Sequence, residues 1–564
     1  MSNEILSASR FARTRGLGRR DFLRGLAVLT AGGVLAACGS AAPSTRSGPP
    51  SNSAPPPNAG TSRSSAPAAA ASSSVRPAAS PASGAGATGT QKLNIAYGQV
   101  PRNMDGISST ALADYQYFQL VYDTLVNVDS GKPAPAVAES WTASDPTNWT
   151  FKLRQGVKFS NGEDLDANAV KFTVDRALAD PKNPWKARIK EVKKVTVADK
   201  YAVNFQLAGP VGNLPTRMSV VWLQPPKYTQ EKGPGGVAAA PIGSGPFVVK
   251  DYKPNESMTL VPNKTYWGGA PAIGEVNFRA MPEPSTRLAS LLSGESHVAM
   301  TMLPEQVNQM KSKGMQVISV PTGQSGNVFF QTSRDTPVKD VRVRQAMDYA
   351  VDKTALFQGM TAGYGRPLNG QMVGPNSVGY SPNIKARPYD PSKARQLLRD
   401  AGFPNGFSIA MDTSLGRYYR DKEVTEAFAS YLSQVDIKVE MNHMQSGAWL
   451  DRLYSGKWGP LNYWSIQDAP AYDLAWTLEI FMSDNLRKIL ADKKFDQMLT
   501  ATSSITDAEK RNKALQDVGQ YFNDQAYTIT LFQDPGLYGV APNVKGITFL
   551  PSTYVKLNKV LIGA

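Results

Sequence analysis

The chain has 564 residues, and its 61 Lys and Arg side chains outnumber its 46 Asp and Glu side chains, for a net charge of +15. Residues 1–37 carry +4 of this charge and residues 38–90 carry +3, so a mild +8 remains on residues 91–564. Because that long segment has no block of like charges and no ribbon of basic and aromatic residues, we expect no nucleic-acid binding.

The N-terminus combines a twin-arginine pair with a cysteine that ends a short apolar run. Arg19 and Arg20 open the run RRDFLR, and the apolar stretch that follows is shorter than the roughly 20 residues that span a bilayer. These residues resemble a twin-arginine export signal, and the LAAC run that ends at Cys38 resembles a bacterial lipobox. The resemblance implies a signal peptide over residues 1–37, cleavage before Cys38 and a lipid on its sulfur. The alternative is an ordinary basic leader with a stray thiol.

Residues 39–90 consist almost entirely of Ala, Ser, Pro, Gly and Thr. Val75 is their only aliphatic β-branched residue, so this segment cannot bury a core. A flexible chain of this length has a root-mean-square reach of roughly 40 Å. We therefore expect residues 38–90 to form a lipidated, disordered stalk that holds a folded domain clear of the outer face of the cytoplasmic membrane.

From Gln91 onward the sequence alternates between strand-like and helix-like segments. Residues 149–154 alternate with a period of two, as a half-buried strand does. Asp166 stands where it can cap a helix whose Val170 and Val174 lie four residues apart on one face. These patterns predict a strand followed by a helix.

The same alternation continues toward the C-terminus. A helix is expected after Asp340, with Val343 and Met347 on its buried face. An amphipathic helix over residues 507–522 precedes an apolar strand over residues 527–532. No repeat of 20 to 50 residues is visible, which excludes solenoids and propellers. The predicted class is α/β.

Four stretches, in the same order along the chain, carry a resemblance to one known family. They are residues 149–178, 243–267, 338–353 and 389–407. The second stretch is the most characteristic, because GSGPFVVKDYKPNESMTLVPNKTYW has a Gly-x-Gly-Pro turn, a hairpin and a final Asn-x-x-Tyr-Trp. On these motifs, residues 91–564 resemble the extracytoplasmic solute-binding proteins of ABC importers, of the oligopeptide, dipeptide and nickel type (solute-binding protein family 5).

The resemblance implies a two-lobed, periplasmic-binding-protein-like fold that closes over its ligand by a hinge motion. Lobe I would comprise residues 91–326 and 532–564, with an extra subdomain inserted at about residues 130–240. Lobe II would comprise residues 327–531. We expect the protein to be a monomer.

The sequence offers little catalytic chemistry. His297 and His443 are the only histidines, and a lone histidine is more often structural than a base or a ligand. Neither a zinc-ligand spacing nor a phosphate-binding loop is present, so we expect no metal, no cofactor and no ATP hydrolysis by this chain. The sequence favours a binding protein over an enzyme.

Aromatic residues gather in the proposed second lobe, as in many binding clefts. Arg417 stands beside two tyrosines, and Tyr463 precedes Trp464. The resemblance implies that the backbone after Trp464 lines the ligand. We therefore assign Arg417, Tyr463 and Trp464 to the ligand site.

Peptide-binding members of the family carry an Asp three residues after this Trp, where it pairs with the ammonium group of the peptide. The residue at that place is Gln467, and Asp468 follows it. Either a shift of one residue lets Asp468 serve, or the protein does not hold a free amino terminus. Asp123 matches another acidic position of the family and is expected to face Asp468 across the cleft. Gln467, Asp468 and Asp123 complete the predicted ligand site.

These observations predict an exported, membrane-tethered substrate-binding lipoprotein that captures a peptide or similar small solute. Its partners would be the solute, an ABC permease with its ATPase subunits, and the membrane that holds the lipid on Cys38. Two alternatives stay open: an exported hydrolase that uses an unrecognised carboxylate pair, and a surface adhesion or chaperone module.

Overall fold

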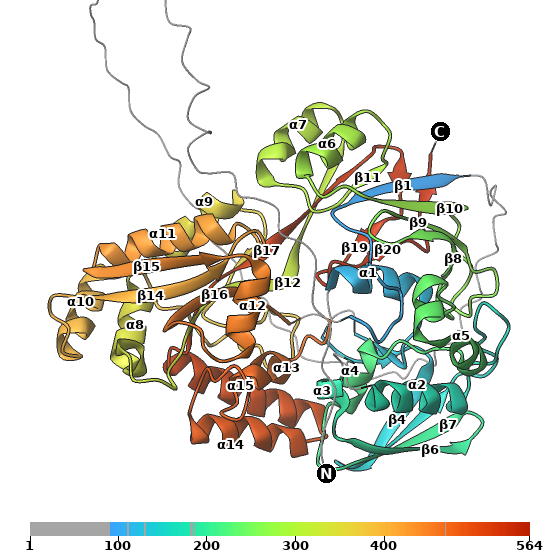
Figure 1. Cartoon of the computed structure of the whole chain (residues 1–564), viewed down its shortest axis with the longest axis horizontal. Helices are drawn as coiled ribbons and strands as arrows, with labels where there is room; N and C mark the ends of the chain where they lie inside the picture. Colours follow the sequence, from blue (N-terminus) through green and yellow to red (C-terminus); the bar gives the residue numbers. More distant parts are fainter. Residues whose placement is uncertain are drawn as a thin grey trace, which may run out of the picture. The chain divides into compact units, whose positions relative to one another are not determined.

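One large mixed β-sheet passes through both lobes of the protein, as the computed structural model in Figure 1 shows. The structure describes residues 91–109, 112–128, 131–180, 183, 186–468 and 470–563. The strands of the large sheet lie in the order β15-β14-β16-β12-β17-β11-β1-β10-β9-β8, and β13 pairs with β17 beside this row. The predicted export signal (Arg19, Arg20), the lipidation site Cys38 and the stalk lie outside the described residues.

The first lobe holds the β8 end of this sheet. Its strands are β1 (Lys92–Tyr97), β8 (Phe247–Lys253), β9 (Ser257–Pro262), β10 (Glu275–Ala280) and β11 (Val298–Ala299). Its helices are α1 (Leu112–Val121), α5 (Pro226–Ala239), α6 (Pro284–Leu292) and α7 (Val307–Ser312), with the short 3-10 helix η2 (Pro304–Gln306) before α7. The C-terminal strands β18 (Val544–Lys545), β19 (Thr548–Phe549), β20 (Val555–Lys556) and β21 (Leu561–Ile562) form two small pairs.

The predicted hairpin after the Gly-x-Gly-Pro turn is confirmed as the antiparallel pair β8–β9. Gly243 is required there by close backbone approach, since a Cβ on this residue would lie 1.9 Å from the carbonyl oxygen of Val121.

A separate four-stranded antiparallel sheet stands between β1 and β8 in the chain. Its order is β4-β5-β7-β6, from β4 (Ala138–Asp145), β5 (Asn148–Leu153), β6 (Val192–Asp199) and β7 (Ala202–Leu207). The neighbouring elements are β2 (Val126–Asn127), β3 (Ala134–Pro135), α2 (Ala167–Ala179), α3 (Lys186–Ile189), α4 (Leu214–Arg217) and the 3-10 helix η1 (Met218–Val220). We call residues 138–217 the small-sheet subdomain.

The strand and helix predicted here are confirmed. Trp149 and Phe151 point inward from β5 and share a core with Val170 and Val174 of α2. Asp166 caps α2, because its carboxylate accepts hydrogen bonds from the backbone amides of the first turn.

Lobe II holds the β15 end of the large sheet. Its strands are β13 (Arg366–Pro367), β14 (Phe407–Ser414), β15 (Ile437–Met444) and β16 (Leu461–Gln467). Its helices are α8 (Val341–Tyr349), α9 (Lys353–Thr361), α10 (Pro391–Asp400), α11 (Asp421–Ser433), α12 (Ser446–Tyr454), α13 (Leu474–Leu478), α14 (Lys493–Ala501) and α15 (Ala508–Asp524). The 3-10 helices are η3 (Pro337–Lys339), η4 (Glu479–Phe481) and η5 (Thr502–Ser504). The predicted helix after Asp340 is confirmed as α8, with Val343 and Met347 fully buried.

Two long strands, β12 (Gln316–Phe330) and β17 (Thr528–Val540), connect the lobes as an antiparallel pair. The pairing shifts register twice, between Pro321 and Ser325 and between Gly326 and Asn327. Irregularities of this kind bend a strand locally. The predicted lobe limits at residues 326/327 and 531/532 fall within this pair, and β17 continues well beyond the apolar strand that the sequence predicted.

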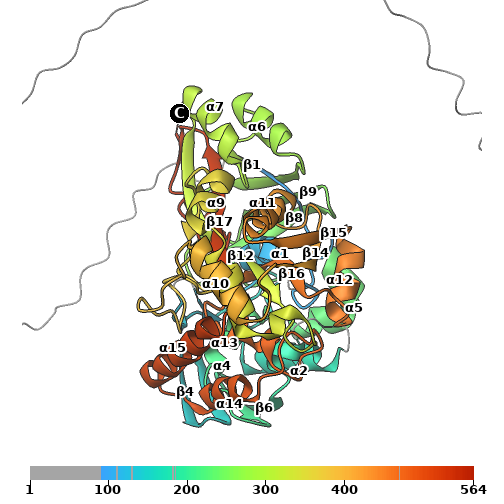
Figure 2. The same cartoon turned by 90° about the vertical axis from the view of Figure 1, so that its left-hand side faces the viewer.

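Helices cover the sheet at opposite ends of the described unit. In Figures 1 and 2, α6 and α7 of the first lobe lie at one end, whereas α14 and α15 of lobe II lie at the other, near the small-sheet subdomain. Across the described ranges, none of the helices has the length and apolarity needed to cross a membrane. The same ranges contain no group of three or more His, Cys, Asp or Glu side chains that could hold a metal ion.

Candidate functional site

The carboxyl ends of parallel strands mark the candidate site. In lobe II, β14 runs parallel to β15 and β16, and these strands end at Ser414, Met444 and Gln467. In the first lobe, β1 runs parallel to β10 and β11. Ligands of open α/β sheets bind beyond the carboxyl ends of the strands, where the following loops gather.

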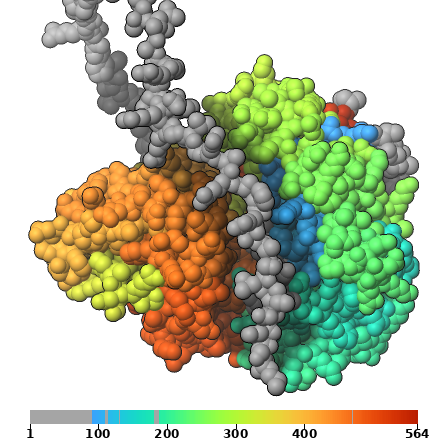
Figure 3. Space-filling model, viewed as in Figure 1, coloured from blue at the N-terminus to red at the C-terminus, as the bar shows by residue number. Residues whose placement is uncertain are grey.

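The loops that follow the two sets of strands meet one another. Arg420, after β14, forms an ion pair of 2.7 Å with Glu305 of η2 in the first lobe. Tyr472 and Trp476, after β16, belong to the same buried cluster as Trp222 of the first lobe. Figure 3 shows the surface hollowed between the orange part of lobe II and the green part of the first lobe, with blue residues deep in the hollow. We call this region the interlobe cleft.

The loop after β14 is organised around one buried carboxylate. Asp421 accepts hydrogen bonds from the backbone amides of Gly416, Arg417 and Tyr418, at 3.0 to 3.2 Å. These contacts fix the conformation of the loop that follows β14. The exposed guanidinium of Arg417 lies 5.5 Å from the ring centre of Tyr418 and 6.0 Å from that of Trp449.

Tyr463 and Trp464 point to opposite faces of β16. Trp464 is 4% exposed and stacks on Phe329, with ring centres 3.5 Å apart and planes 6° apart. The edges of Trp449 and Trp458 pack around it at 6.2 and 5.9 Å. The ring of Trp464 therefore belongs to the core of lobe II, whereas the sequence predicts a ligand contact at this residue.

The backbone that follows Trp464 has one free edge, which no described strand pairs with. β12 pairs with β16 along Leu461–Gln467, but β14 pairs only with Leu461–Tyr463. Within the described residues, no strand covers the other edge of residues 464–467. Gln467, which is half-buried, lies at the end of this edge.

Asp468 holds a neighbouring loop. Its buried carboxylate accepts hydrogen bonds from the backbone amide of Gly374 at 3.1 Å and from the hydroxyl of Ser377 at 2.8 Å. Its own amide donates to the carbonyl oxygen of Gly323 in β12. These contacts connect the end of β16 to residues 374–377 and to a crossing strand.

Asp123 lies in a different environment, within the first lobe. Its carboxylate accepts a hydrogen bond of 3.0 Å from the indole N–H of Trp267. Burial raises the pKa of Asp123 to about 6, although hydrogen bonds from Trp267, Ser244 and Tyr266 act to lower it.

The structure thus brings most, but not all, of the predicted site residues together. Tyr463, Trp464 and Gln467 belong to β16 and Asp468 comes directly after it, whereas the ring of Trp449 contacts both Trp464 and Arg417. The described contacts of Asp123 are all with its own lobe, and none joins it to Asp468. Its assignment to the ligand site stays a prediction.

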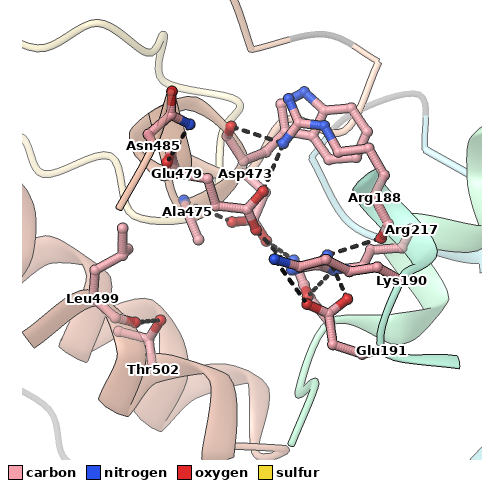
Figure 4. A network of polar contacts seen from close by, with 12 residues as sticks. Arg188, Lys190, Glu191, Arg217, Asp473, Ala475, Glu479, Asn485, Leu499 and Thr502 are labelled. Atoms are coloured by element: carbon pink, nitrogen blue, oxygen red, sulfur yellow. Dashed lines mark hydrogen bonds and ion pairs between the residues drawn. The ribbon is translucent and has the colours of Figure 1, made fainter. Parts of the chain in front are cut away.

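An ion-pair network that sequence reasoning missed joins the small-sheet subdomain to lobe II (Figure 4). The carboxylate of Glu479 in η4 accepts hydrogen bonds from the guanidinium groups of Arg188 and Arg217, each with an N–O distance of 2.7 Å. The guanidinium of Arg188 also lies 3.9 Å from the ring centre of Trp476. We call Arg188, Arg217, Glu479 and the pair Asn213–Asp473 the interlobe clasp.

The second part of the clasp is fully buried. Asn213 donates to Asp473 at 3.2 Å, and Arg511 binds both oxygens of that carboxylate at 2.7 and 3.1 Å. Burial alone would raise the pKa of Asp473, but Arg511 and the hydrogen bonds hold it below its usual value. Beside it, the amide of Gly212 donates to the carbonyl oxygen of Ser503 at 2.7 Å. Local sequence patterns carry no signal of these contacts, because the partners lie far apart in the chain.

Comparison with known proteins agrees with this architecture. The family model described as bacterial extracellular solute-binding proteins, family 5 middle, matches residues 132–479. The chain is 27% identical over 451 residues to the glutathione-binding protein GsiB of Salmonella paratyphi A, covering 77% of this chain and 87% of that protein.

Solved structures share the fold. The periplasmic binding protein DppA of Helicobacter pylori, in complex with the peptide STSA, has a TM-score of 0.71 at 23% identity, over 85% of this chain and 99% of that one. NikA of Brucella suis, in complex with Fe(III)-EDTA, has a TM-score of 0.74 at 22% identity, over 84% of this chain and 100% of that one.

Proposed function

Because the chain belongs to family 5 of the bacterial extracellular solute-binding proteins, we propose that it captures a peptide or a similar small solute and delivers it to an ABC permease. The observation that carries the peptide class is the edge of β16 over residues 464–467 that no described strand covers, at the carboxyl end of the parallel strands of lobe II. An extended peptide can add to such an edge through main-chain hydrogen bonds, which do not depend on its side chains. This backbone recognition suits a protein that accepts solutes of varied sequence.

Relatives support a small, peptide-like solute. One relative is named for glutathione, itself a tripeptide, and one structural neighbour was solved with the tetrapeptide STSA. Family membership sets aside the exported hydrolase, since proteins of this family bind solutes and are not enzymes. An adhesion or chaperone module would need no small solute, so that alternative predicts that the purified protein binds none.

Binding is coupled to lobe closure in this proposal. A solute on the β16 edge also contacts the first lobe, so it stabilises the closed arrangement in proportion to its extra affinity for that arrangement. The Glu305–Arg420 ion pair and the interlobe clasp add contacts that form only when the lobes are together. The irregular pairing of β12 and β17 is the part of the sheet best suited to bend.

The N-terminal residues complete the proposed role. Arg19 and Arg20 would direct export by the twin-arginine route, and the lipid on Cys38 would tether a monomer to the outer face of the cytoplasmic membrane. Two or more acyl chains hold a protein on a membrane, whereas a single chain does so only marginally. The permease and its ATPase subunits would then supply the energy of transport.

The proposal is tested by titrating the purified protein, by isothermal calorimetry, with glutathione, Met-Leu and Ser-Thr-Ser-Ala, and by mass spectrometry of solutes that co-purify with it. We expect binding of one solute per protein, lobe closure in small-angle X-ray scattering, and recovery of the solute unchanged. Conversion of the solute, or the absence of both binding and co-purified solute, would contradict the proposal.

A further inference from the structure

Asp534 is a buried acid in the crossing strand β17, close to the first register shift with β12. Its carbonyl oxygen accepts a hydrogen bond of 3.1 Å from the hydroxyl of Thr322. Its side chain is directed to Ser465 of β16, whose hydroxyl lies 3.4 Å from Oδ2. Asp534 is 4% exposed, and its Oδ1 has no hydrogen-bond partner among the described residues.

Several other buried acids of the described chain have strong partners. Asp473 forms an ion pair with Arg511, and Asp348 forms one with Lys353. Asp421 accepts hydrogen bonds from several backbone amides. No lysine or arginine of the described residues forms an ion pair with Asp534. A buried carboxylate without a cation or strong donors is costly to ionise, so a partner from outside the chain would be strongly favoured.

Asp534 lies where the crossing strand β17 passes the second half of β16. Ser465 belongs to the free edge of β16, and Tyr463 on the same face directs its hydroxyl over Gly326 of β12. A Cβ on Gly326 would lie 2.6 Å from that hydroxyl oxygen, so the glycine leaves room for this polar group. Burial raises the pKa of Tyr419, in the loop at the carboxyl end of β14, and the nearby charge of Asp534 adds a smaller rise.

We propose that Asp534 binds the positively charged group of the solute, an ammonium or a guanidinium, with Ser465 and Tyr463 as neighbouring hydroxyl groups. This inference rests on the proposed function and names the solute chemistry: a peptide-like molecule that carries a cation. It assigns that role to Asp534, because Asp468 and Asp123 already accept hydrogen bonds from their own neighbours.

The proposal includes one proton transfer. Burial raises the pKa of Asp534 to about 8, although the hydrogen bond from Ser465 acts to lower it. Near pH 7 the carboxyl is therefore mostly protonated, and a bound cation replaces that proton, which passes to solvent. The groups that face this region are the hydroxyls of Tyr463 and Tyr419, the carboxylate of Asp421, and the Arg420–Glu305 pair beside Tyr419.

The test compares each member of the peptide panel with its N-acetylated form, in the wild-type protein, in Asp534→Asn and in the control Asp335→Asn. Asp335 is almost fully exposed, with a side-chain exposure of 96%. We expect the wild type and the control to prefer the free amine by about thirtyfold or more, and Asp534→Asn to lose this preference. Calorimetry in two buffers of different ionisation enthalpy should show proton release of up to one per bound peptide in the wild type at pH 7, and none in Asp534→Asn.

Three results would overturn the inference: an unchanged preference in Asp534→Asn, equal binding of free and acetylated peptides by the wild type, or a panel in which no amine-bearing peptide binds. The comparison is made within each variant, so a loss of stability in Asp534→Asn does not obscure it. Binding of acetylated peptides with lobe closure, or co-purification of a neutral solute, would leave the proposed function standing without Asp534 as the cation site.

Discussion

Arg217 and Glu479, which are 262 residues apart in the chain, form an ion pair of 2.7 Å that joins the small-sheet subdomain to lobe II. Arg217 is 9% exposed at its side chain and Glu479 is 31% exposed, so the pair is only partly screened by water. Because Arg188 shares the same carboxylate, one glutamate connects two arginines of the subdomain to the lobe that carries β16. The contact between the lobes therefore includes a charged group outside the proposed solute-binding edge of β16.

We predict that Glu479→Gln weakens solute binding without touching the solute. The glutamine keeps one acceptor oxygen but loses the charge that both arginines face, at a cost of about 1 to 2 kcal/mol in the closed state. The apparent Kd should rise about 5- to 30-fold, and scattering should show a more open average form. Glu426→Gln is the control, since its weak contact with Lys422 is exposed. Equal affinities of the two variants would argue against the clasp.

Trp464→Ala should destabilise the unliganded protein. The ring is buried and stacked on Phe329, so its removal leaves a cavity that costs about 3 to 5 kcal/mol. Chemical denaturation of the unliganded variant measures this loss, with Tyr454→Ala as a control because Tyr454 is 49% exposed. An unchanged unfolding midpoint together with weaker binding would restore the contact role that the sequence predicted.

Asp534→Asn should change how stability depends on pH. The folded pKa of about 8 exceeds the value near 3.9 of an unfolded Asp, so the folded state binds the extra proton between these limits. The carboxyl therefore contributes stability at low pH that is lost as the pH rises toward 8, by at most about 1.4 kcal/mol per pH unit. Asparagine does not titrate, so the free energy of unfolding of Asp534→Asn does not fall in this way as the pH rises.

Unfolding free energies of wild type and Asp534→Asn at pH 5, 6, 7 and 8 give the difference directly. The variant should gain stability relative to the wild type across this series. A constant difference would mean that Asp534 does not titrate in this range.

Asp123→Ala should act on stability more than on affinity. The change leaves the partly buried indole N–H of Trp267 without its acceptor, which costs about 1 kcal/mol. Trp267→Phe removes the donor instead, and the double mutant should cost less than the sum of the single changes. A large loss of affinity in Asp123→Ala with unchanged unfolding would place this acid at the ligand.

Cys38→Ala should release the protein from membranes while leaving its fold intact, because the predicted anchor and the folded residues are separate parts of the chain. Cell fractionation followed by detergent extraction measures the release, and the melting temperature of the released protein checks the fold. Recovery of the variant in the membrane pellet, in a detergent-sensitive form, would contradict the lipobox prediction.

Local sequence patterns predicted the elements of the fold well. The strand at residues 149–154, the helix capped by Asp166 and the helix that follows Asp340 are all present, because hydrophobic period and capping act over a few residues. Family motifs predicted the two-lobed architecture and the solute-binding role in the same way, since each motif is a contiguous stretch of chain.

Which polar groups meet was decided by the tertiary structure. The sequence placed Asp123 opposite Asp468, but burial and hydrogen bonding give these acids separate partners, Trp267 and the loop at Gly374. No local pattern distinguishes Asp534 from other acids of the chain, because its burial and its lack of a cation exist only in the folded structure. Composition and periodicity determine which segments form strands and helices, whereas the environment of a charge depends on residues that folding brings from hundreds of positions away.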